Sequence, residues 1–222
     1  FGATHHSDVG EDGRRIITVP PGSYRAVEHY VVEPDASAAS YFFAAAAICG
    51  GRVRVEGLGA TSLQGDIAFV GALEQMGATV ERGADHITVT GGAPLQGVDV
   101  DFTDLSDTAQ TLAVVAPFAS SATTITGIGF IRAKETDRIA AVVTELGRCG
   151  IRAEELPDGI RVHPGTPQPA TVSTYDDHRM AMSFALLGLR TPGIRIADPG
   201  VVAKTFPGYW AALEDLRRSG RP

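Results

Sequence analysis

The chain has 222 residues, of which 44% are hydrophobic and 20% are charged, a composition typical of one or two globular domains with proper cores. Its formal net charge of −7 argues against nucleic acid or an anionic membrane as the main partner, because both need a net basic face. No run approaches the roughly 18 apolar residues of a membrane span, and we expect no signal peptide at residues 1–6. We therefore expect a cytoplasmic protein that holds any bound anion locally.

Cysteine and histidine patterns predict neither a disulfide framework nor a metal site. Cys49 and Cys149 lie in apolar or helix-end contexts without metal-ligand spacing, which indicates reduced thiols. His5 and His6 could bind a metal together with Asp8, but a loose surface strand at a glycine-rich start is the simpler interpretation. The chain opens with polar turns and without Met, and we interpret it as a fragment.

A first strand is predicted at residues 15–19, and after it a unit of about 70 residues recurs along the chain. The first copy predicts an almost wholly apolar helix at 35–48, which Gly50-Gly51 ends, and a strand at 52–56. A second helix at 65–76 and a hairpin with strands at 79–81 and 86–90 complete this copy.

The second copy repeats each step, and the third copy is cut short. The second predicts an apolar helix at 108–118, a strand at 123–126, a helix ending at Gly150, and strands at 151–155 and 159–163. The third predicts a helix at 180–189, a strand at 193–196 and a last helix at 207–218. A helix that is apolar on every side must be buried all round, so we expect the first helix of each copy inside the fold, with sheets outside.

The charged run Arg132-Ala133-Lys134-Glu135-Thr136-Asp137-Arg138-Ile139 stands between the strand and the helix of the second copy. We expect it to form the first turn of that helix, where Lys134 and Arg138, four residues apart, would share a face. Two cations beside the Glu135 carboxylate and the free N–H groups of a helix start make a candidate anion site with an acid or base inside it. The alternative is a solvated helix start with ordinary side-chain pairs.

If the buried helices run parallel, their polar starts converge with Lys134 and Glu135. Several helix N-termini aimed at one place would attract anions strongly, even on an acidic protein. The alternative is that each Asp or Ser is only an N-cap, worth roughly 1 kcal/mol. The residues concerned are Asp35, Ser37, Asp107, Asp177 and Arg179.

Five motifs in order resemble signatures of the 5-enolpyruvylshikimate 3-phosphate synthase family. They are Asp35-Ala36-Ser37-Ala38-Ala39-Ser40-Tyr41-Phe42, Gln64-Gly65-Asp66, Lys134-Glu135-Thr136-Asp137-Arg138, Asp177-His178-Arg179-Met180-Ala181-Met182 and Lys204-Thr205-Phe206-Pro207. The resemblance implies an α/β fold, an enolpyruvyl transferase-type lobe of repeated βαβαββ units around buried parallel helices, or inside-out α/β barrel. It covers roughly the C-terminal half of the family, with residues 1–62 as the remainder of the N-terminal lobe and residues 63–222 as the C-terminal lobe.

The resemblance implies a transferase of aromatic amino-acid biosynthesis, the shikimate pathway enzyme that glyphosate targets. The family transfers the enolpyruvyl group of phosphoenolpyruvate to the 5-hydroxyl of shikimate 3-phosphate and releases phosphate. It needs no cofactor and no metal. Its partners are the two small-molecule substrates, without nucleic acid or membrane, and we expect a monomeric parent.

On the shikimate side, the resemblance implies that Asp107 accepts hydrogen bonds from the substrate hydroxyls and acts as the base. Glu135 would donate the proton to the methylene carbon, and Lys134 would contact the shikimate moiety. Ser37 and Tyr41 would help to hold the shikimate phosphate. The family usually has two adjacent serines where this chain has Ser37 followed by alanine, so either Ser37 or Ser40 replaces that contact.

On the phosphoenolpyruvate side, the resemblance implies a clamp of Arg138, Arg179 and Lys204, because arginine forks suit carboxylate and phosphate groups. Asp177 and His178 would support the clamp. Two rival interpretations stay open: a relative that acts on UDP-N-acetylglucosamine, whose family lacks these charged runs, and a non-catalytic isolated lobe. The second follows because the family's active site lies between two lobes, so we expect this chain to be inactive alone.

Overall fold

The structure is a computed structural model of the 222-residue chain and describes residues 1–219. Its contacts divide the chain into two compact units, Phe1–Glu33 and a second that begins at Pro34. The first unit contains an antiparallel hairpin of β1 (His6–Val9) and β2 (Arg15–Thr18), whose side chains are exposed. The strand predicted at 15–19 is therefore confirmed, and His6 and Asp8 lie on an exposed strand.

The first copy of the repeat builds a three-stranded antiparallel sheet beside a long buried helix. Asp35 caps that helix by accepting from the backbone N–H groups of Ser37 and Ala38, and Gly50 ends it in the left-handed conformation with φ 79°. The sheet order is β3-β5-β4. The elements are α1 (Ala36–Cys49), β3 (Arg52–Glu56), η1 (Gly65–Ala68), α2 (Phe69–Gln75), β4 (Thr79–Arg82) and β5 (His86–Thr90).

The second copy contains a complete βαβαββ unit. Its sheet has the order β6-β7-β9-β8, with β6 parallel to β7 and the other pairs antiparallel. The elements are β6 (Asp99–Asp101), η2 (Ser106–Thr108), α3 (Ala109–Val115), η3 (Ala116–Phe118), β7 (Thr123–Thr126), η4 (Gly129–Ala133), α4 (Arg138–Arg148), β8 (Ala153–Leu156) and β9 (Gly159–Val162).

The third copy begins in the same way, with β10 parallel to β11 on either side of a buried helix. It closes with a surface helix instead of a second strand pair within the described residues. The elements are β10 (Thr171–Val172), α5 (His178–Ala185), η5 (Leu186–Leu189), β11 (Arg195–Ile196), η6 (Pro199–Lys204) and α6 (Tyr209–Ser219). No helix within residues 1–219 has both the length and the apolar character that crossing a membrane requires.

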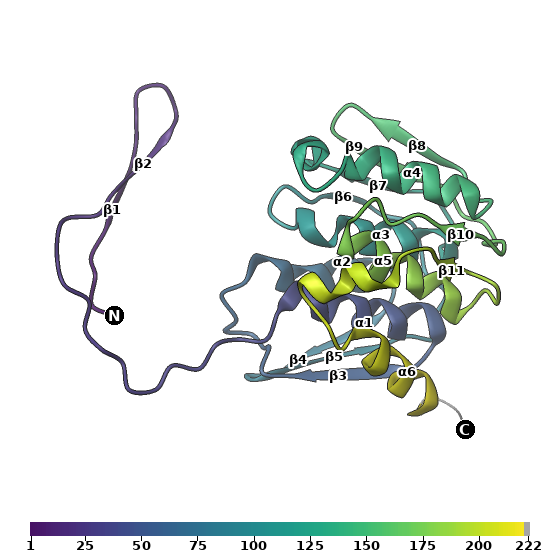
Figure 1. Ribbon diagram of the computed structural model, residues 1–222, viewed down its shortest axis with the longest axis horizontal. Helices are drawn as coiled ribbons and strands as arrows, with labels where there is room; N and C mark the ends of the chain where they lie inside the picture. The colour runs from purple at the N-terminus through teal and green to yellow at the C-terminus, as the bar shows by residue number, and fades with distance from the viewer. Residues whose placement is uncertain (220–222) are drawn as a thin grey trace. The chain divides into compact units, whose positions relative to one another are not determined.

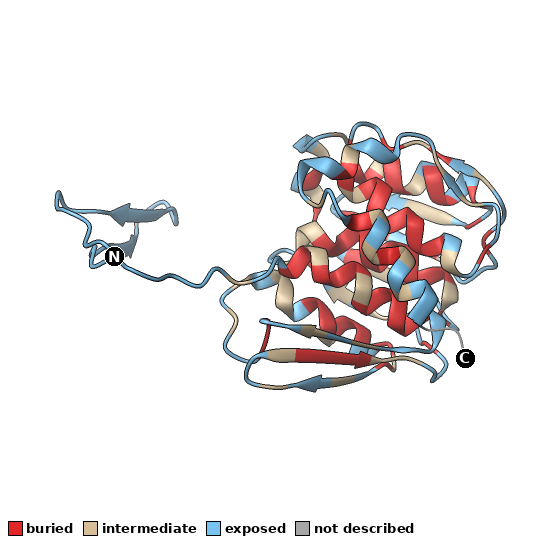
Figure 2. Ribbon diagram, turned by 60° about the horizontal axis from the view of Figure 1, so that its bottom comes forward, coloured by how far each residue is buried: buried red, intermediate tan, exposed pale blue. Residues whose placement is uncertain are grey.

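The helices α1, α3 and α5 form the centre of the second unit, and α3 packs against both of the others (Figures 1 and 2). All seven residues of α3 are buried, and α1 and α5 are buried on nearly every side. The prediction that the first helix of each copy lies inside the fold is confirmed. The sheets β3-β5-β4 and β6-β7-β9-β8 lie outside these helices (Figure 1).

A chain of hydroxyl groups joins the three central helices deep in the core. Ser40 Oγ lies 3.3 Å from Thr111 Oγ1, which lies 3.3 Å from Ser183 Oγ. All three side chains are buried, so each hydroxyl satisfies the next where water is excluded. The contacts set α1, α3 and α5 at fixed heights relative to one another.

The charged run does not form the first turn of a helix, which corrects the prediction from its spacing. Lys134 has φ −84° and ψ −143°, and α4 begins only at Arg138. Asp137 is the N-cap, because its carboxylate accepts from the backbone N–H of Ala140 at 3.0 Å. Arg132 donates to the same carboxylate at 2.9 Å, so the loop folds back against the cap. Lys134 and Glu135 therefore lie on a loop ahead of the helix.

The compact units divide at residues 33 and 34, whereas the sequence placed a lobe boundary at residues 62 and 63. Helix α1 packs against α2, α3 and η1, so residues 34–62 belong to the same packed body as the rest of the chain up to α6. Gln64 links the two segments, accepting from Ala36 N at 2.9 Å and donating to the carbonyl of Pro34 at 2.7 Å.

Candidate anion-binding active site

Asp107 is contacted by three cations from different parts of the second unit. Lys134 Nζ donates to Oδ1 at 2.6 Å and Arg138 Nη1 to the same oxygen at 3.1 Å, while Arg179 Nη2 donates to Oδ2 at 2.7 Å. Burial raises the pKa of Asp107, but the hydrogen bond from Lys134 and the charges of all three cations outweigh it, so the pKa lies below its ordinary value. Asp107 is therefore ionised at neutral pH.

Glu135 is held between Arg138 and a fourth cation, Lys204. Its Oε1 accepts from Lys204 Nζ at 2.5 Å, and its Oε2 accepts from Arg138 Nη2 at 2.7 Å. The Lys204 hydrogen bond is the largest influence and burial opposes it, so that the pKa of Glu135 falls to about 2. In this arrangement the carboxylate cannot carry a proton at neutral pH. Glu135 can become an acid only when these contacts weaken, above all the hydrogen bond from Lys204, which is the largest cause of its low pKa.

Arg138 connects the two carboxylates to a third. Its side chain is 1% exposed, and its Nε donates to Asp177 Oδ2 at 2.7 Å. Asp177 is 0% exposed and is also the N-cap of α5, where its Oδ1 accepts from the backbone N–H of Arg179 at 2.8 Å. A buried guanidinium is tolerated only with full pairing, and here three carboxylates supply it. Arg138 thus ties the starts of α3, α4 and α5 together.

His178 lies beside this network in the first turn of α5. It is 3% exposed, and its Nδ1 has no hydrogen-bond partner within residues 1–219, lying 3.8 Å from Asp177 Oδ1. Burial lowers the pKa of His178, and the charge of Arg179 lowers it further against the opposing charges of Asp177 and Glu135. The imidazole is therefore neutral at pH 7.

Ser37 and Asp66 form the adjoining wall of the site, at the start of α1. Ser37 Oγ donates to Asp66 Oδ2. Burial raises the pKa of Asp66, the Ser37 hydrogen bond opposes it, and the charges of Asp107 and Arg179 also act on it. Sequence reasoning named Asp66 within a motif but gave it no role. Its signal was the Gln64-Gly65-Asp66 run, whose glycine backbone lies close to the carbonyl of Asp104.

Tyr41 lies beneath the site, with its hydroxyl enclosed by protein. Its side chain is 1% exposed and packs edge-on against Tyr209, with ring centroids 5.7 Å apart. The hydroxyl has no hydrogen-bond partner within residues 1–219, and burial raises the pKa of Tyr41 to about 12 against the opposing charge of Arg179. In this conformation Tyr41 lies near enough to Arg179 for the two to influence each other electrostatically, and its enclosed hydroxyl would have to move to contact a ligand phosphate.

The side chains proposed from the sequence are thus brought together, although they are spread over 168 positions from Ser37 to Lys204. The shared contacts place the starts of α1, α3 and α5 at one end of the bundle, and the hydroxyl chain joins the same helices farther in. The helices therefore run parallel, as predicted. The cluster consists of Asp107, Lys134, Glu135, Arg138, Asp177, His178, Arg179 and Lys204, with Ser37, Tyr41 and Asp66 adjoining.

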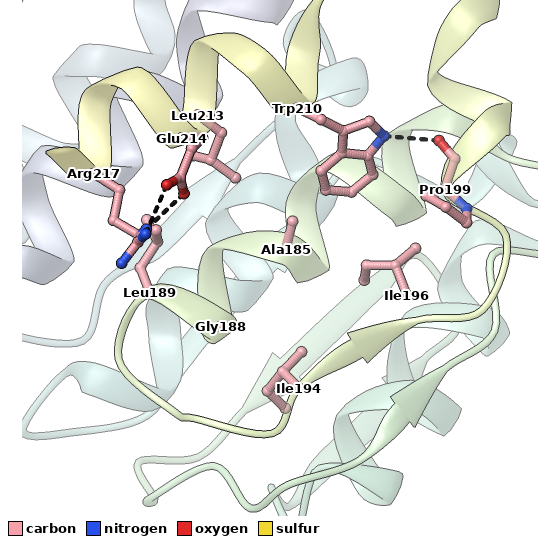
Figure 3. A pocket seen from close by; sticks show the side chains of 10 residues that line it. All are labelled: Ala185, Gly188, Leu189, Ile194, Ile196, Pro199, Trp210, Leu213, Glu214 and Arg217. Atoms are coloured by element: carbon pink, nitrogen blue, oxygen red, sulfur yellow. Dashed lines mark hydrogen bonds and ion pairs between the residues drawn. The ribbon is translucent and has the colours of Figure 1, made fainter.

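An apolar groove lies elsewhere, between α5, β11 and α6 (Figure 3). Trp210 lines it and donates from Nε1 to the carbonyl of Pro199 at 2.9 Å. Its charged residues, Glu214 and Arg217, bond to each other at 2.6 Å. Without converging cations, this groove does not offer the chemistry of the charged cluster.

Among residues 1–219, one group of side chains could hold a metal ion. Glu56, Asp85 and His86 lie on the β3–β5 pair and the turn before β5, with ligand atoms within 4.8 Å of one another. Both carboxylates are exposed, and Glu56 already pairs with Arg54 at 2.6 Å. We assign this group no role in the charged cluster.

Residues 7–213 match the family described as EPSP synthase (3-phosphoshikimate 1-carboxyvinyltransferase). The chain belongs to this family. A 3-phosphoshikimate 1-carboxyvinyltransferase from Nostoc punctiforme is 54% identical over 203 residues, which are 91% of this chain and 48% of the relative. One from Laribacter hongkongensis is 50% identical over 223 residues, covering 98% of this chain and 51% of the relative. The chain therefore spans about half the length of these curated relatives.

Solved structures also match most of this chain and about half of their own length or less. An EPSP synthase from Acinetobacter baumannii aligns with a TM-score of 0.83 at 29% identity, covering 97% of this chain and 52% of the other. The enolpyruvyl transferase NikO from Streptomyces tendae aligns with a TM-score of 0.63 at 23% identity and shares the fold, covering 84% of this chain and 43% of the other. The α/β fold expected from the sequence is confirmed.

Proposed function

We propose that this chain is the C-terminal part of an enzyme that transfers the enolpyruvyl group of phosphoenolpyruvate to the 5-hydroxyl of shikimate 3-phosphate and releases phosphate. The observation that supports this most is the convergence of Lys134, Arg138, Arg179 and Lys204 on two carboxylates. The reaction requires cations for anionic substrates, a base near a hydroxyl and an acid near a methylene carbon. This cluster contains a candidate for each role.

Phosphoenolpyruvate would bind to Arg179 and Lys204, with Arg138 fixed behind them. Lys204 is 56% exposed and Arg179 is 12% exposed, whereas Arg138 is 1% exposed and already fully paired. The exposed ammonium can exchange its carboxylate partner for a ligand phosphate at small cost. Arg138 then acts mainly by holding Asp107, Glu135 and Asp177 in place.

Binding of the phosphoenolpyruvate anion would also prepare Glu135 as the acid. The Lys204 hydrogen bond is the largest cause of its low pKa, so a ligand that draws Lys204 away raises the pKa of Glu135 toward its ordinary value of 4.5. The negative charge of the bound phosphoenolpyruvate beside the carboxylate raises that pKa further and favours the protonated form. Proton donation to the methylene carbon is then tied to occupancy of the site. Without phosphoenolpyruvate in the site, Glu135 stays ionised and cannot donate a proton.

Asp107 would serve the acceptor side. Its low pKa keeps it ionised, and Lys134 lies 2.6 Å away to contact the same substrate. A carboxylate can accept hydrogen bonds from the shikimate hydroxyls and take the proton of the attacking 5-hydroxyl as the new C–O bond forms. Ser37 and Asp66 stand on the adjoining wall, where a ring hydroxyl or phosphate would lie.

For the domain arrangement, the packing supports a lobe that begins at Pro34, with residues 1–33 as the part that leads into it. We place the parent in the cytoplasm, because Cys49 and Cys149 are both free thiols, as a reducing compartment favours. We also propose that the parent works as a monomer on these two small substrates.

Reconstitution tests the proposed function. The 222-residue chain, mixed with phosphoenolpyruvate and shikimate 3-phosphate, should release no phosphate alone. Adding the complementary N-terminal half of the Nostoc punctiforme relative should restore phosphate release that requires both substrates. Release with UDP-N-acetylglucosamine as acceptor would support the rival transferase, and absence of release in every mixture would support a non-catalytic lobe. Turnover by the chain alone would show that it is complete.

A further inference from the structure

The turn before α5 has an unusual backbone. Tyr175 and Asp176 have φ of 55° and 57°, and they are the non-glycine residues with left-handed φ within residues 1–219. Such a conformation is disfavoured for residues that carry a Cβ, and two in succession persist only where their surroundings enforce them. The turn leads directly into Asp177, which caps α5 and binds Arg138. The strained turn therefore lies next to Asp177, which joins the start of α5 to Arg138 in the charged cluster.

Glu145 enforces this turn from the neighbouring helix. Its side chain is 0% exposed, its Oε1 accepts from the Tyr175 hydroxyl at 2.6 Å, and its Oε2 accepts from the backbone N–H of Ser173 at 3.0 Å. Arg148 lies 3.3 Å from the same carboxylate and also donates to Ser173 Oγ at 2.9 Å. A buried carboxylate needs such donors to offset its lost hydration. Burial and the hydrogen bond to Glu145 raise the pKa of Tyr175, so its hydroxyl remains a donor at neutral pH.

One face of α4 thus grips the turn at two points. Arg138 and Glu145 are seven residues apart, which places them on the same side of the helix. Arg138 binds Asp177 after the turn, and Glu145 binds Ser173 and Tyr175 before it or within it. The left-handed pair lies between these two attachments.

We propose that Glu145 and Tyr175 are positioning residues that hold the left-handed turn and thereby fix the Asp177 carboxylate against Arg138 and the start of α5 that carries Arg179. Neither Glu145 nor Tyr175 touches the cations of the site, so both act through Asp177. This clamp of Glu145 on the Tyr175 turn is separate from the phosphoenolpyruvate clamp expected from the sequence. Its consequence for anion binding rests on the proposed function, whereas the clamp itself does not.

The test is Tyr175→Phe in the 222-residue chain, which removes one oxygen atom and keeps the ring. Since Tyr175 is 38% exposed, the variant retains the packing of the core. The readout is hydrogen exchange of the Arg138 Nε–H group, followed by NMR and assigned with Arg138→Lys. This proton is donated to Asp177 and should be protected from exchange. We expect it to exchange about tenfold faster in Tyr175→Phe, because local opening of the turn separates the pair.

Tyr209→Phe is the matched control. Tyr209 is buried, unlike Tyr175, and donates its hydroxyl to the carbonyl of Met182 at 2.7 Å, away from the turn. It should lower overall stability at least as much as Tyr175→Phe, because its hydroxyl bond is buried, while leaving the exchange of Arg138 Nε–H within about twofold of the parent chain. Equal exchange in Tyr175→Phe and Tyr209→Phe would overturn the clamp, as would an Arg138 Nε–H that is unprotected in the parent chain.

A second readout separates the clamp from the proposed function. In the reconstituted mixture, Tyr175→Phe should raise the phosphoenolpyruvate concentration required for half-maximal rate about fivefold, because Arg179 is less often in place, and Tyr209→Phe should not. If the mixture is inactive, the proposed function fails and the exchange measurement alone decides the clamp. If exchange accelerates in Tyr175→Phe but not in Tyr209→Phe, the clamp stands whichever reaction the parent catalyses.

Discussion

The Arg138–Asp177 pair and the Lys204–Glu135 pair belong to one site but differ in their access to water. Arg138 and Asp177 are 1% and 0% exposed, whereas Lys204 and Glu135 are 56% and 27% exposed. Removing one partner of a buried pair leaves an uncompensated charge, while an exposed pair contributes little to stability. The Arg138–Asp177 pair is therefore structural, whereas Lys204 can exchange the Glu135 carboxylate for a ligand anion.

The strongest way to break this comparison is Asp177→Ala. It leaves Arg138 without its buried partner and α5 without its cap, so the free energy of unfolding should fall by about 3–5 kcal/mol. Urea unfolding measures this loss. Glu214→Gln, which removes a carboxylate paired with Arg217 on the surface, should leave the transition where it was. A similar midpoint for both variants would mean that Arg138 does not depend on Asp177.

Glu135→Gln should reverse the pattern, with a large effect on rate and a small one on stability. In the reconstituted enzyme kcat should fall by about 10²–10⁴-fold while the affinity for substrates changes little, because the acid acts mainly in the transition state. Steady-state phosphate release provides the measurement. Glu155→Gln is the control, since Glu155 also accepts from an arginine, Arg132, at 2.9 Å. An unchanged kcat would remove Glu135 from the mechanism.

Lys204→Ala should weaken phosphoenolpyruvate binding by about tenfold, equivalent to about 1.4 kcal/mol. The lost group is exposed and bonds to Glu135, so the fold should tolerate its removal. Calorimetry on the reconstituted enzyme reports the affinity, and Lys204→Arg, which keeps the charge, should retain most of it. Equal affinity in Lys204→Ala and the parent would place phosphoenolpyruvate elsewhere.

The smallest expected effect is on the pH dependence of stability, to which the exposed Lys204–Glu135 pair contributes. The pKa of Glu135 is about 2 in the folded chain and 4.5 as an ordinary value, so its ion pair contributes stability above pH 4.5 that is lost as the pH falls toward 2. Since the pair is partly exposed, we expect only a few tenths of a kcal/mol. Lys204→Met should reduce the loss of unfolding free energy between pH 6 and pH 3. The same slope in both chains would show that the pair does not persist in solution.

The sequence predicted the central helices because their chemistry is local. The helix from Ala36 to Cys49 is apolar on every side and ends at a glycine, so burial and length could both be read from the residues. The repeat then predicted that the helix starts converge, which explains why Glu135 and Arg179 were expected in one site, whereas Lys204 was added by the family resemblance. The residue roles remain predictions until the variants above are measured.

What the sequence did not provide depends on contacts between distant segments. Lys134 was expected on a helix because its spacing to Arg138 fits one, but the Asp137 cap starts the helix later. The left-handed backbone at Tyr175 is stabilised by Glu145, 30 residues away, and no local pattern signals it. The packing of residues 34–62 onto the later helices likewise depends on tertiary contacts.

The hydroxyl chain from Ser40 through Thr111 to Ser183 has a consequence for ligand studies. A shift of one helical turn would move any of these oxygens by about 5.4 Å and strand it in an apolar core. These hydroxyl contacts therefore resist sliding of α1, α3 and α5 past one another. The contacts of the charged cluster lie within one packed unit, so the anion binding that we propose for it can be titrated on the 222-residue chain itself.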